Sequence, residues 1–241
     1  MALHRSLLRK RQHYNKDEPP RRQEIGPQNL GVLLGALGVL AASCLMKKIV
    51  LASNNAGKLR EFAELFAPLG IELLPQSAFN VSEAEEPHVT FIENALAKAR
   101  HCAHATGLPA LADDSGLCVS ALGDAPGVFS ARYSGEPKSD ARNNEKLLIE
   151  LQGKANRRAH YVCVLALCRH ADDPQPLIAE GEWHGEILDA PRGSGGFGYD
   201  PLFFVPTHRC ASAELDADEK NRISHRGVAL QSLLIRLRAG T

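Results

Sequence analysis

Four polar clusters in this chain of 241 residues combine side chains suited to phosphate and nucleobase chemistry. The first is Ser53-Asn54-Asn55-Ala56-Gly57-Lys58, which separates a short apolar run from an amphipathic stretch. Small side chains let backbone N–H groups at a helix N-terminus approach a phosphate, and Lys58 adds a positive charge. The cluster lacks the GxxxxGK[ST] pattern of a Walker A loop, and an ordinary strand–turn–helix connection explains it equally well.

Acidic residues form the second cluster, in two stretches. One stretch holds Glu83, Glu85 and Glu86, and the other is Asp113-Asp114-Ser115-Gly116 at the end of an apolar run. Carboxylates at the end of such a strand need a positive neighbour to stay ionised, and Mg²⁺ binds through one or two carboxylates together with phosphate oxygens. The alternatives are a solvated loop for the glutamates and a turn, with Asp as a helix cap, for residues 113–116.

The third cluster is Gly193-Ser194-Gly195-Gly196-Phe197-Gly198-Tyr199-Asp200. Its glycines allow close backbone approach, Phe197 and Tyr199 offer flat surfaces for a base, and Asp200 offers an acceptor. A glycine-rich hairpin loop with core aromatic residues has the same composition.

The fourth cluster places Lys220 and Ser224-His225-Arg226 at the start of the last predicted helix. Basic groups at a helix N-terminus oppose the helix macrodipole, and a bound anion or a base carbonyl would account for them. A solvated helix start is the alternative.

The elements that must position these clusters alternate along the chain, which indicates a mixed α/β domain. Thr90 and Glu93 predict a capped helix start. Apolar runs predict strands at 49–52, 71–74, 108–112, 160–170, 177–188 and 202–205. Amphipathic spacing predicts helices from the 53–58 loop to Gly70, over 90–106, over 139–151, and in a final segment with Leu230, Leu233, Leu234 and Leu237 on one face.

The overall composition excludes several classes of protein. Lys and Arg total 28, as do Asp and Glu, so the formal net charge is zero and no whole-chain basic footprint for nucleic acid exists. Apolar residues make up 44% and charged residues 23%, as in a globular protein. Six cysteines without a CxxC pair argue against a disulfide scaffold or a structural zinc site, and they indicate small buried residues in a reducing compartment.

Residues 1–45 differ in composition from the rest of the chain. They hold seven basic and three acidic residues, and an apolar run from Leu30 to Leu45 follows the polar part. The run is near the length of a signal-peptide apolar core, and residues 41–44 hint at a cleavage or lipidation site. We interpret 1–45 as a disordered leader or an over-extended N-terminus with the natural start at Met46, and 46–241 as the domain. Secretion and an anchoring extension are the alternatives.

Residues 46–241 resemble the inosine-triphosphate pyrophosphatases. The segments that carry the resemblance are SNNAGK (53–58), TFIENALAKA (90–99), ALADDSGL (110–117), PGVFSARYSG (126–135), GGFGYDPLF (195–203) and ISHRG (223–227). The resemblance implies an elongated α/β domain, with a mixed sheet flanked by helices, that forms a homodimer in the cytoplasm. It implies Mg²⁺-dependent hydrolysis of ITP, dITP and XTP to the monophosphate and pyrophosphate, with no nucleic acid partner and no membrane association for 46–241.

The resemblance also assigns roles to single residues. Asp114 is expected to act as general base and metal ligand, Glu85 as a second metal-proximal carboxylate, and Lys98 as a further phosphate contact. The phosphate loop falls on residues 53–58, with Ser115 contacting substrate. Base recognition falls on Phe197, Gly198, Tyr199, Asp200, Lys220, His225 and Arg226. A nucleotide-binding module without hydrolysis and a pyrophosphatase for modified pyrimidine or other nucleotides are the competing functions.

Overall fold

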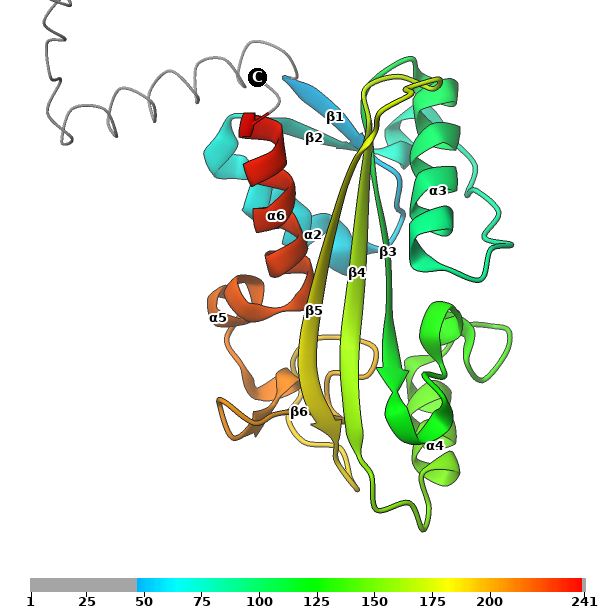
Figure 1. Ribbon diagram of the computed structural model, residues 1–241, viewed down its shortest axis with the longest axis vertical. Helices are drawn as coiled ribbons and strands as arrows, with labels where there is room; N and C mark the ends of the chain where they lie inside the picture. The colour runs from blue at the N-terminus through cyan, green and yellow to red at the C-terminus, as the bar shows by residue number, and fades with distance from the viewer. Residues whose placement is uncertain (1–46, 240–241) are drawn as a thin grey trace, which may run out of the picture. The chain divides into compact units, whose positions relative to one another are not determined.

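The computed structural model describes residues 47–239, in which a seven-stranded mixed sheet carries helices on its two faces (Figure 1). The strand order in space is β2-β1-β3-β4-β5-β6-β7. Strand β1 pairs in parallel with β2 and β3, and every later pairing is antiparallel. The strands are β1 (Lys48–Leu51), β2 (Glu72–Pro75), β3 (Ala110–Val119), β4 (Arg158–Cys168), β5 (Leu177–Ile187), β6 (Phe203–Val205) and β7 (Cys210–Ala211).

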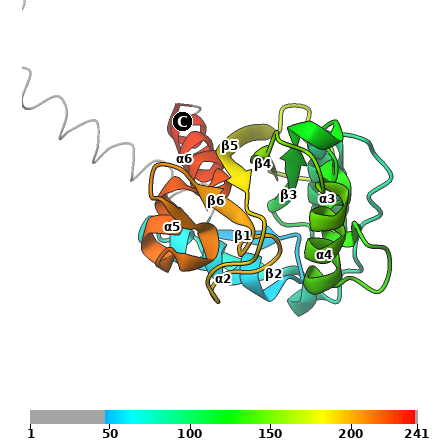
Figure 2. The same ribbon diagram turned by 90° about the horizontal axis from the view of Figure 1, so that it is seen from below.

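The main helices lie on opposite sides of the long strands (Figure 2). The helices are α2 (Ala56–Phe66), α3 (Phe91–Thr106), α4 (Asp140–Glu150), α5 (Ala217–Ile223) and α6 (His225–Ala239). Successive side chains of a strand point to opposite faces. Cys163 and Leu165 of β4 therefore pack with Leu230 of α6, while Val164 packs with Ala99 of α3.

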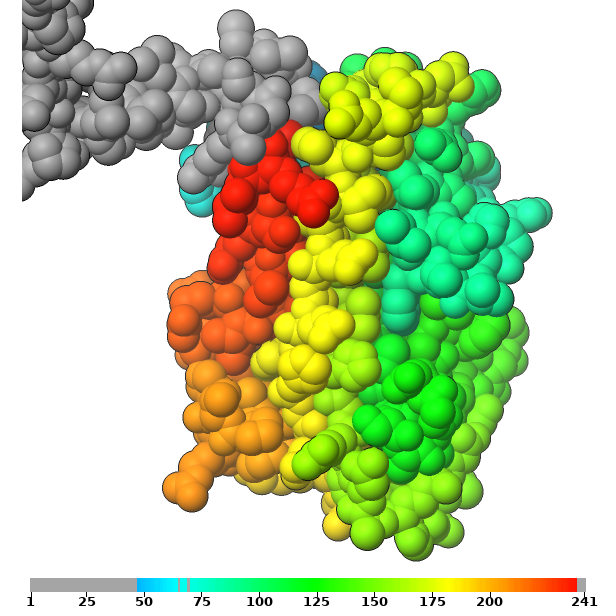
Figure 3. Space-filling model, in the orientation of Figure 1, coloured from blue at the N-terminus to red at the C-terminus, as the bar shows by residue number. Residues whose placement is uncertain are grey.

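The sheet is not covered everywhere, and β5 shows this most clearly. Its exposed and buried residues alternate from Glu180 to Ile187, with Glu180, Glu182, His184 and Glu186 exposed. Figure 3 shows this strand at the surface between α6 and the α3 region. The period of two is that of a strand with one covered and one open face.

Strand β3 is longer than the sequence predicts, and this is the main correction to the fold. The predicted strand at 108–112 ended before Asp113, but β3 continues to Val119 and pairs with β4 throughout. The segment 113–116 is therefore neither a turn nor a helix cap. Gly116 is required for close packing, because a Cβ there would lie 2.2 Å from the Gly127 carbonyl oxygen.

The predicted cap at Thr90 is confirmed, and two further helices begin at side-chain caps that were not predicted. Asn55 caps α2, Thr90 caps α3 and Ser139 caps α4, each accepting backbone N–H groups through its side chain. At Thr90 the hydroxyl also donates to the Glu93 carboxylate at 2.6 Å. Lys220 lies on the separate helix α5 and not at the start of the final helix, which begins at His225. Strand β7 was not predicted.

Several sequence-based expectations concern other parts of the chain. The leader 1–45 and the start at Met46 lie outside the described residues. In residues 47–239, we find no helix with the length and apolar character needed to cross a bilayer. Four of the cysteines are buried as expected, and Cys210 is partly exposed: the free thiols in this range are Cys102, Cys118, Cys163, Cys168 and Cys210.

Candidate active site

Two cavities adjoin at the C-terminal end of β1 and along the middle of β3. The larger, of about 530 Å³, is lined by charged residues, and the smaller, of about 130 Å³, is lined by aromatic and basic residues. They share Asn55, Lys58, Ser115 and Ala131 in their walls. Residues from all four predicted clusters, distant in sequence, therefore meet around these two adjoining cavities.

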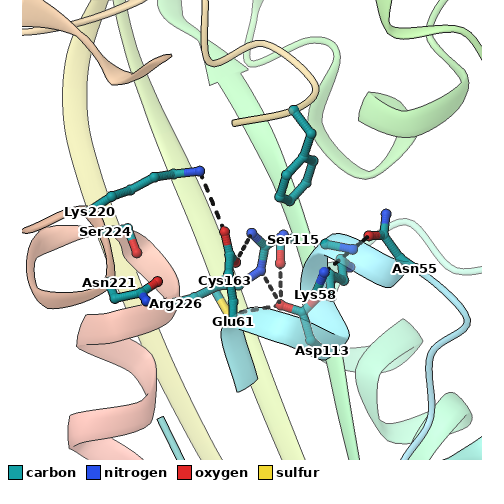
Figure 4. A network of polar contacts seen from close by, with 12 residues as sticks. Asn55, Lys58, Glu61, Asp113, Ser115, Cys163, Lys220, Asn221, Ser224 and Arg226 are labelled. Carbon is teal, nitrogen blue, oxygen red and sulfur yellow. Dashed lines mark hydrogen bonds and ion pairs between the residues drawn. The ribbon is translucent and has the colours of Figure 1, made fainter. Parts of the chain in front are cut away.

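Asp113 is the centre of a buried charge network (Figure 4). Its carboxylate pairs with Lys58 of α2 and lies 3.4 Å from Arg226 Nε of α6, and it accepts hydrogen bonds from Ser115 and, at 3.1 Å, from the Cys163 thiol. Burial alone would raise the pKa of Asp113, but Lys58 and Arg226 hold it well below the usual range. An ionised Asp113 thus fixes two cations at the junction of the cavities.

Asp114 faces the opposite side of the sheet, because adjacent residues of a strand alternate. Lys98 Nζ of α3 lies 2.7 Å from Asp114 Oδ1 and 3.0 Å from Glu86 Oε1, and Arg132 holds the other Glu86 oxygen at 3.0 Å. Burial raises the pKa of Asp114 above its usual value, although Lys98 opposes the shift. The two aspartates therefore do not act as a carboxylate pair: Asp113 stays an anion, whereas Asp114 is the more basic group.

In the 53–58 loop, side chains cap the backbone N–H groups at the start of α2. Asn55 Oδ1 accepts the backbone N–H groups of Gly57 at 2.9 Å and Lys58 at 3.1 Å, and Ser53 Oγ accepts the N–H of Asn55. The Asn55 oxygen occupies the place that an anion takes at a helix N-terminus. A phosphate oxygen could replace it if the Asn55 side chain turned away.

The smaller cavity combines a flat ring with two fixed cations. Lys220 Nζ and Arg226 Cζ lie 5.1 Å and 5.3 Å from the centre of the Phe197 ring. Asp200 accepts from Lys220 at 2.8 Å, and Glu61 lies 2.9 Å from Arg226 Nη1. These two carboxylates thereby hold Lys220 and Arg226 in place beside the ring.

His225 is buried beside this pair and is uncharged. Burial, followed by the neighbouring Arg226, lowers its pKa well below the usual value. Its ring stacks on Tyr161 with centroids 4.7 Å apart, and Nδ1 is buried with no hydrogen-bond partner within residues 47–239. A neutral imidazole with a free nitrogen can donate or accept one hydrogen bond.

Most of the predicted site residues line these two cavities. Tyr199 does so while it is buried in the core, where its hydroxyl donates to the Ser130 carbonyl oxygen at 2.8 Å, so the core-aromatic interpretation fits it. Glu85 lines the larger cavity, but Glu86 is the glutamate that bonds to Lys98.

Three residues of the network were absent from the predicted site. Asp113 belongs to the predicted acidic cluster, with a turn as the alternative, but it was given no role of its own in the site. Its place at the end of an apolar run was the available signal. Glu61 and Arg132 carry no local signal, since each lies on a helical segment where a charged residue is ordinary.

The carboxylates suit one magnesium ion bound together with phosphate. Within the part of the chain that the structure describes, no three His, Cys, Asp or Glu side chains converge in a group able to hold a metal. Mg²⁺ needs only one or two carboxylates when phosphates complete its shell. Asp114 Oδ2, which is buried with no hydrogen-bond partner among residues 47–239, is a suitable ligand atom.

A mixed sheet with this polar cleft defines an α/β protein built to hold a phosphorylated ligand. The model of the Ham1 family matches residues 49–235, and the chain belongs to this family. This confirms the resemblance noted from the sequence motifs.

Two relatives match this domain over nearly their whole length. The dITP/XTP pyrophosphatase of Chromobacterium violaceum is 66% identical over 192 residues, which is 80% of this chain and 98% of that protein. That of Aromatoleum aromaticum is 67% identical over 190 residues, 79% of this chain and 96% of that protein.

Solved structures of the family share the fold. A HAM1 protein from Coxiella burnetii superposes with a TM-score of 0.76 at 52% identity, covering 80% of this chain and 100% of that one. The Ham1 protein of Staphylococcus aureus gives a TM-score of 0.73 at 41% identity, covering 81% of this chain and 100% of that one. The predicted fold class, a mixed sheet flanked by helices, is therefore confirmed.

Proposed function

We propose that this chain hydrolyses non-standard purine nucleoside triphosphates, namely ITP, dITP and XTP, to the monophosphate and pyrophosphate. The observation that carries the proposal is the junction of the two cavities at Asn55, Lys58 and Ser115. A charged space for phosphates meets an aromatic, basic pocket for a base, which is the division that a nucleotide requires. The relatives from Chromobacterium violaceum and Aromatoleum aromaticum are dITP/XTP pyrophosphatases, which supports dITP and XTP as substrates.

The charge of the larger cavity supports a divalent cation as cofactor. Six acidic and four basic side chains line it, so its formal charge is −2 before any phosphate enters. A triphosphate adds further negative charge, so a cation is required for binding. Asp114 and a glutamate of the 83–86 segment would hold Mg²⁺, which would supply charge neutralisation on the phosphate oxygens.

Asp114 is placed for general-base catalysis on a water molecule. Its carboxylate borders the larger cavity, where the phosphates are proposed to bind, so it can accept a proton from a water molecule held there. The water attacks the α-phosphorus in line, and Asp114 takes its proton. Lys58 and Lys98, which line the larger cavity, are placed to stabilise the negative charge of the departing pyrophosphate.

Base selection follows from the donors of the smaller cavity. Hypoxanthine and xanthine present a 6-keto acceptor, whereas adenine presents a 6-amino donor. Lys220 and Arg226 would face that amine without forming a hydrogen bond, and an unpaired buried donor costs about 1–3 kcal/mol. ATP is therefore expected to be a poor substrate.

We also propose that the protein is a homodimer in the cytoplasm. The family resemblance supports the dimer, and the free thiols suit a reducing compartment. Light scattering of the purified chain tests the dimer, and fractionation of the host cell tests the compartment.

Pyrophosphate release from a nucleotide panel tests the enzymatic proposal. ITP, XTP and dITP should be hydrolysed in the presence of Mg²⁺, with ATP, GTP and dUTP as comparisons, and a chelator should stop the reaction. Comparable kcat/KM for ATP and ITP would refute the proposed base selection, and binding of ITP without pyrophosphate release would indicate a non-hydrolytic binding protein. Preference for a pyrimidine triphosphate would favour the competing pyrophosphatase.

A further inference from the structure

Helix α4 forms two hydrogen bonds with the loop that carries Phe197, and both involve the same loop residue, Gly198. The Gly198 N–H donates to Asp140 Oδ2 at 2.7 Å, and the Gly198 carbonyl oxygen accepts from Asn144 Nδ2 at 2.8 Å. Asp140 and Asn144 are one helical turn apart and so lie on the same side of α4. Both polar groups of one loop residue are thus bound by a helix more than fifty positions away in sequence.

The conformation of Gly198 makes this contact specific. Its φ of +63° lies in the left-handed region, which glycine adopts without strain. The Asn144 amide oxygen is buried without a hydrogen-bond partner in the described part of the chain. The amide is therefore oriented for Gly198, and that orientation leaves its own oxygen unsatisfied.

The residues beside Gly198 are the ones that face the proposed base. Phe197 donates its N–H to Asp200 at 2.8 Å. The Phe197 ring packs against the 53–58 loop: a Cβ at Gly57 would lie only 3.1 Å from a ring carbon. A displacement of Gly198 would move the Phe197 ring away from both Gly57 and the cations on its face.

We propose that Asp140 and Asn144 are positioning residues that hold the Phe197 ring against the nucleobase. This inference rests on the proposed function, since it assigns a role within the same site. Asp140 lines the smaller cavity, and neither residue lines the larger cavity that is proposed to hold the phosphates. Stacking on Phe197 is equal in the bound substrate and the transition state, so these residues act on KM and not on kcat.

The test compares single variants in steady-state hydrolysis of ITP. Asp140→Ala should raise KM about 10-fold and Asn144→Ala roughly 2- to 10-fold, each with kcat within about twofold of wild type. Asp140→Asn keeps an oxygen that accepts from Gly198, so it should restore KM to near the wild-type value. Glu145→Ala, at an exposed position of the same helix, is the matched control and should leave KM unchanged.

Melting curves separate positioning from a purely structural role. Asp140 is exposed, so its removal should shift the melting midpoint little. A lower midpoint with unchanged KM would overturn the proposal, as would an Asp140→Asn variant as impaired as Asp140→Ala.

A binding measurement keeps this proposal distinct from the proposed function. If wild-type protein releases no pyrophosphate from ITP, the proposed function fails. The same variants are then compared by calorimetric titration with IMP. Weaker IMP binding by the alanine variants supports the positioning role, and equal binding refutes it.

Discussion

Replacing Asp114 by Asn tests the proposed chemistry most directly. The amide cannot accept the proton of the attacking water, and it is a poorer ligand for a hard cation. General-base catalysis is typically worth about 10²–10⁴-fold, so kcat for ITP should fall by at least about 10². The assay is pyrophosphate release at saturating ITP and Mg²⁺.

The same substitution has two opposing effects on stability. Asp113 and Asp114 lie on opposite faces of β3, so the variant relieves no close repulsion between them, contrary to what their adjacency in sequence suggests. Instead, Lys98 loses a carboxylate partner at 2.7 Å, while Glu86 and the new amide oxygen remain. Burial raises the pKa of Asp114, so its ionised form is disfavoured in the folded protein, and removing that charge offsets the lost ion pair. The melting midpoint should therefore change little.

The two measurements together decide the role of Asp114. Asp172→Asn, an identical change at an exposed position of the β4–β5 connection, is the control and should alter neither kcat nor the midpoint. A purely structural Asp114 predicts a lower midpoint with near-normal kcat. An Asp114→Asn variant that keeps more than about a tenth of the wild-type kcat would refute the base assignment.

Three further predictions concern other parts of the molecule. Lys220→Met should lower the ratio of kcat/KM for ITP over ATP about 10-fold, because a donor to the 6-keto group is lost; an unchanged ratio would contradict this role. The Arg169 hydrogen bond lowers the pKa of Asp173, so the stability it contributes is complete above about pH 4 and is lost as the pH falls through the folded pKa. The melting midpoints of wild type and Asp173→Asn should therefore differ most at pH 7, with a difference that shrinks progressively below about pH 4, and a constant difference would exclude this linkage. A chain that begins at Met46 should turn over ITP like the full chain, since the site residues lie within 53–226; loss of activity would assign a role to the leader.

Local sequence signals predicted correctly that residues 53–58 connect a strand to a helix. A short apolar strand, an Asn that can cap a helix and a following glycine are interactions within a few residues, and the structure contains all three. The segment 113–116 was misjudged because Asp, Ser and Gly favour turns when only neighbours in sequence are considered. Its strand conformation depends on Lys58, Lys98 and Arg226, which neutralise the carboxylates from three different helices.

The glutamates that pair with those cations could not be predicted from the local sequence either. Glu61 belongs to the polar side of an amphipathic helix, and the helical pattern is the same whether it faces water or, as here, Arg226 at 2.9 Å. Among Glu83, Glu85 and Glu86, the segment has no regular period that could tell which side chain points inward. Only the pairing of Glu86 with Lys98 and Arg132 distinguishes it.

The different roles of the two aspartates follow from one structural fact, the extension of β3 through them. In a strand of period two, Asp113 must face α2 and α6 while Asp114 must face α3. Asp113 then meets two cations and becomes a permanent anion that organises Lys58 and Arg226. Asp114 shares a single lysine with Glu86, keeps one oxygen without a partner in the described chain, and gains basicity from burial. Moving the strand register by one residue would exchange the environments of the two aspartates. The pairing of Asp114 with Val164 of β4 therefore decides which of the two carboxylates lies beside Lys98 and is proposed as the base.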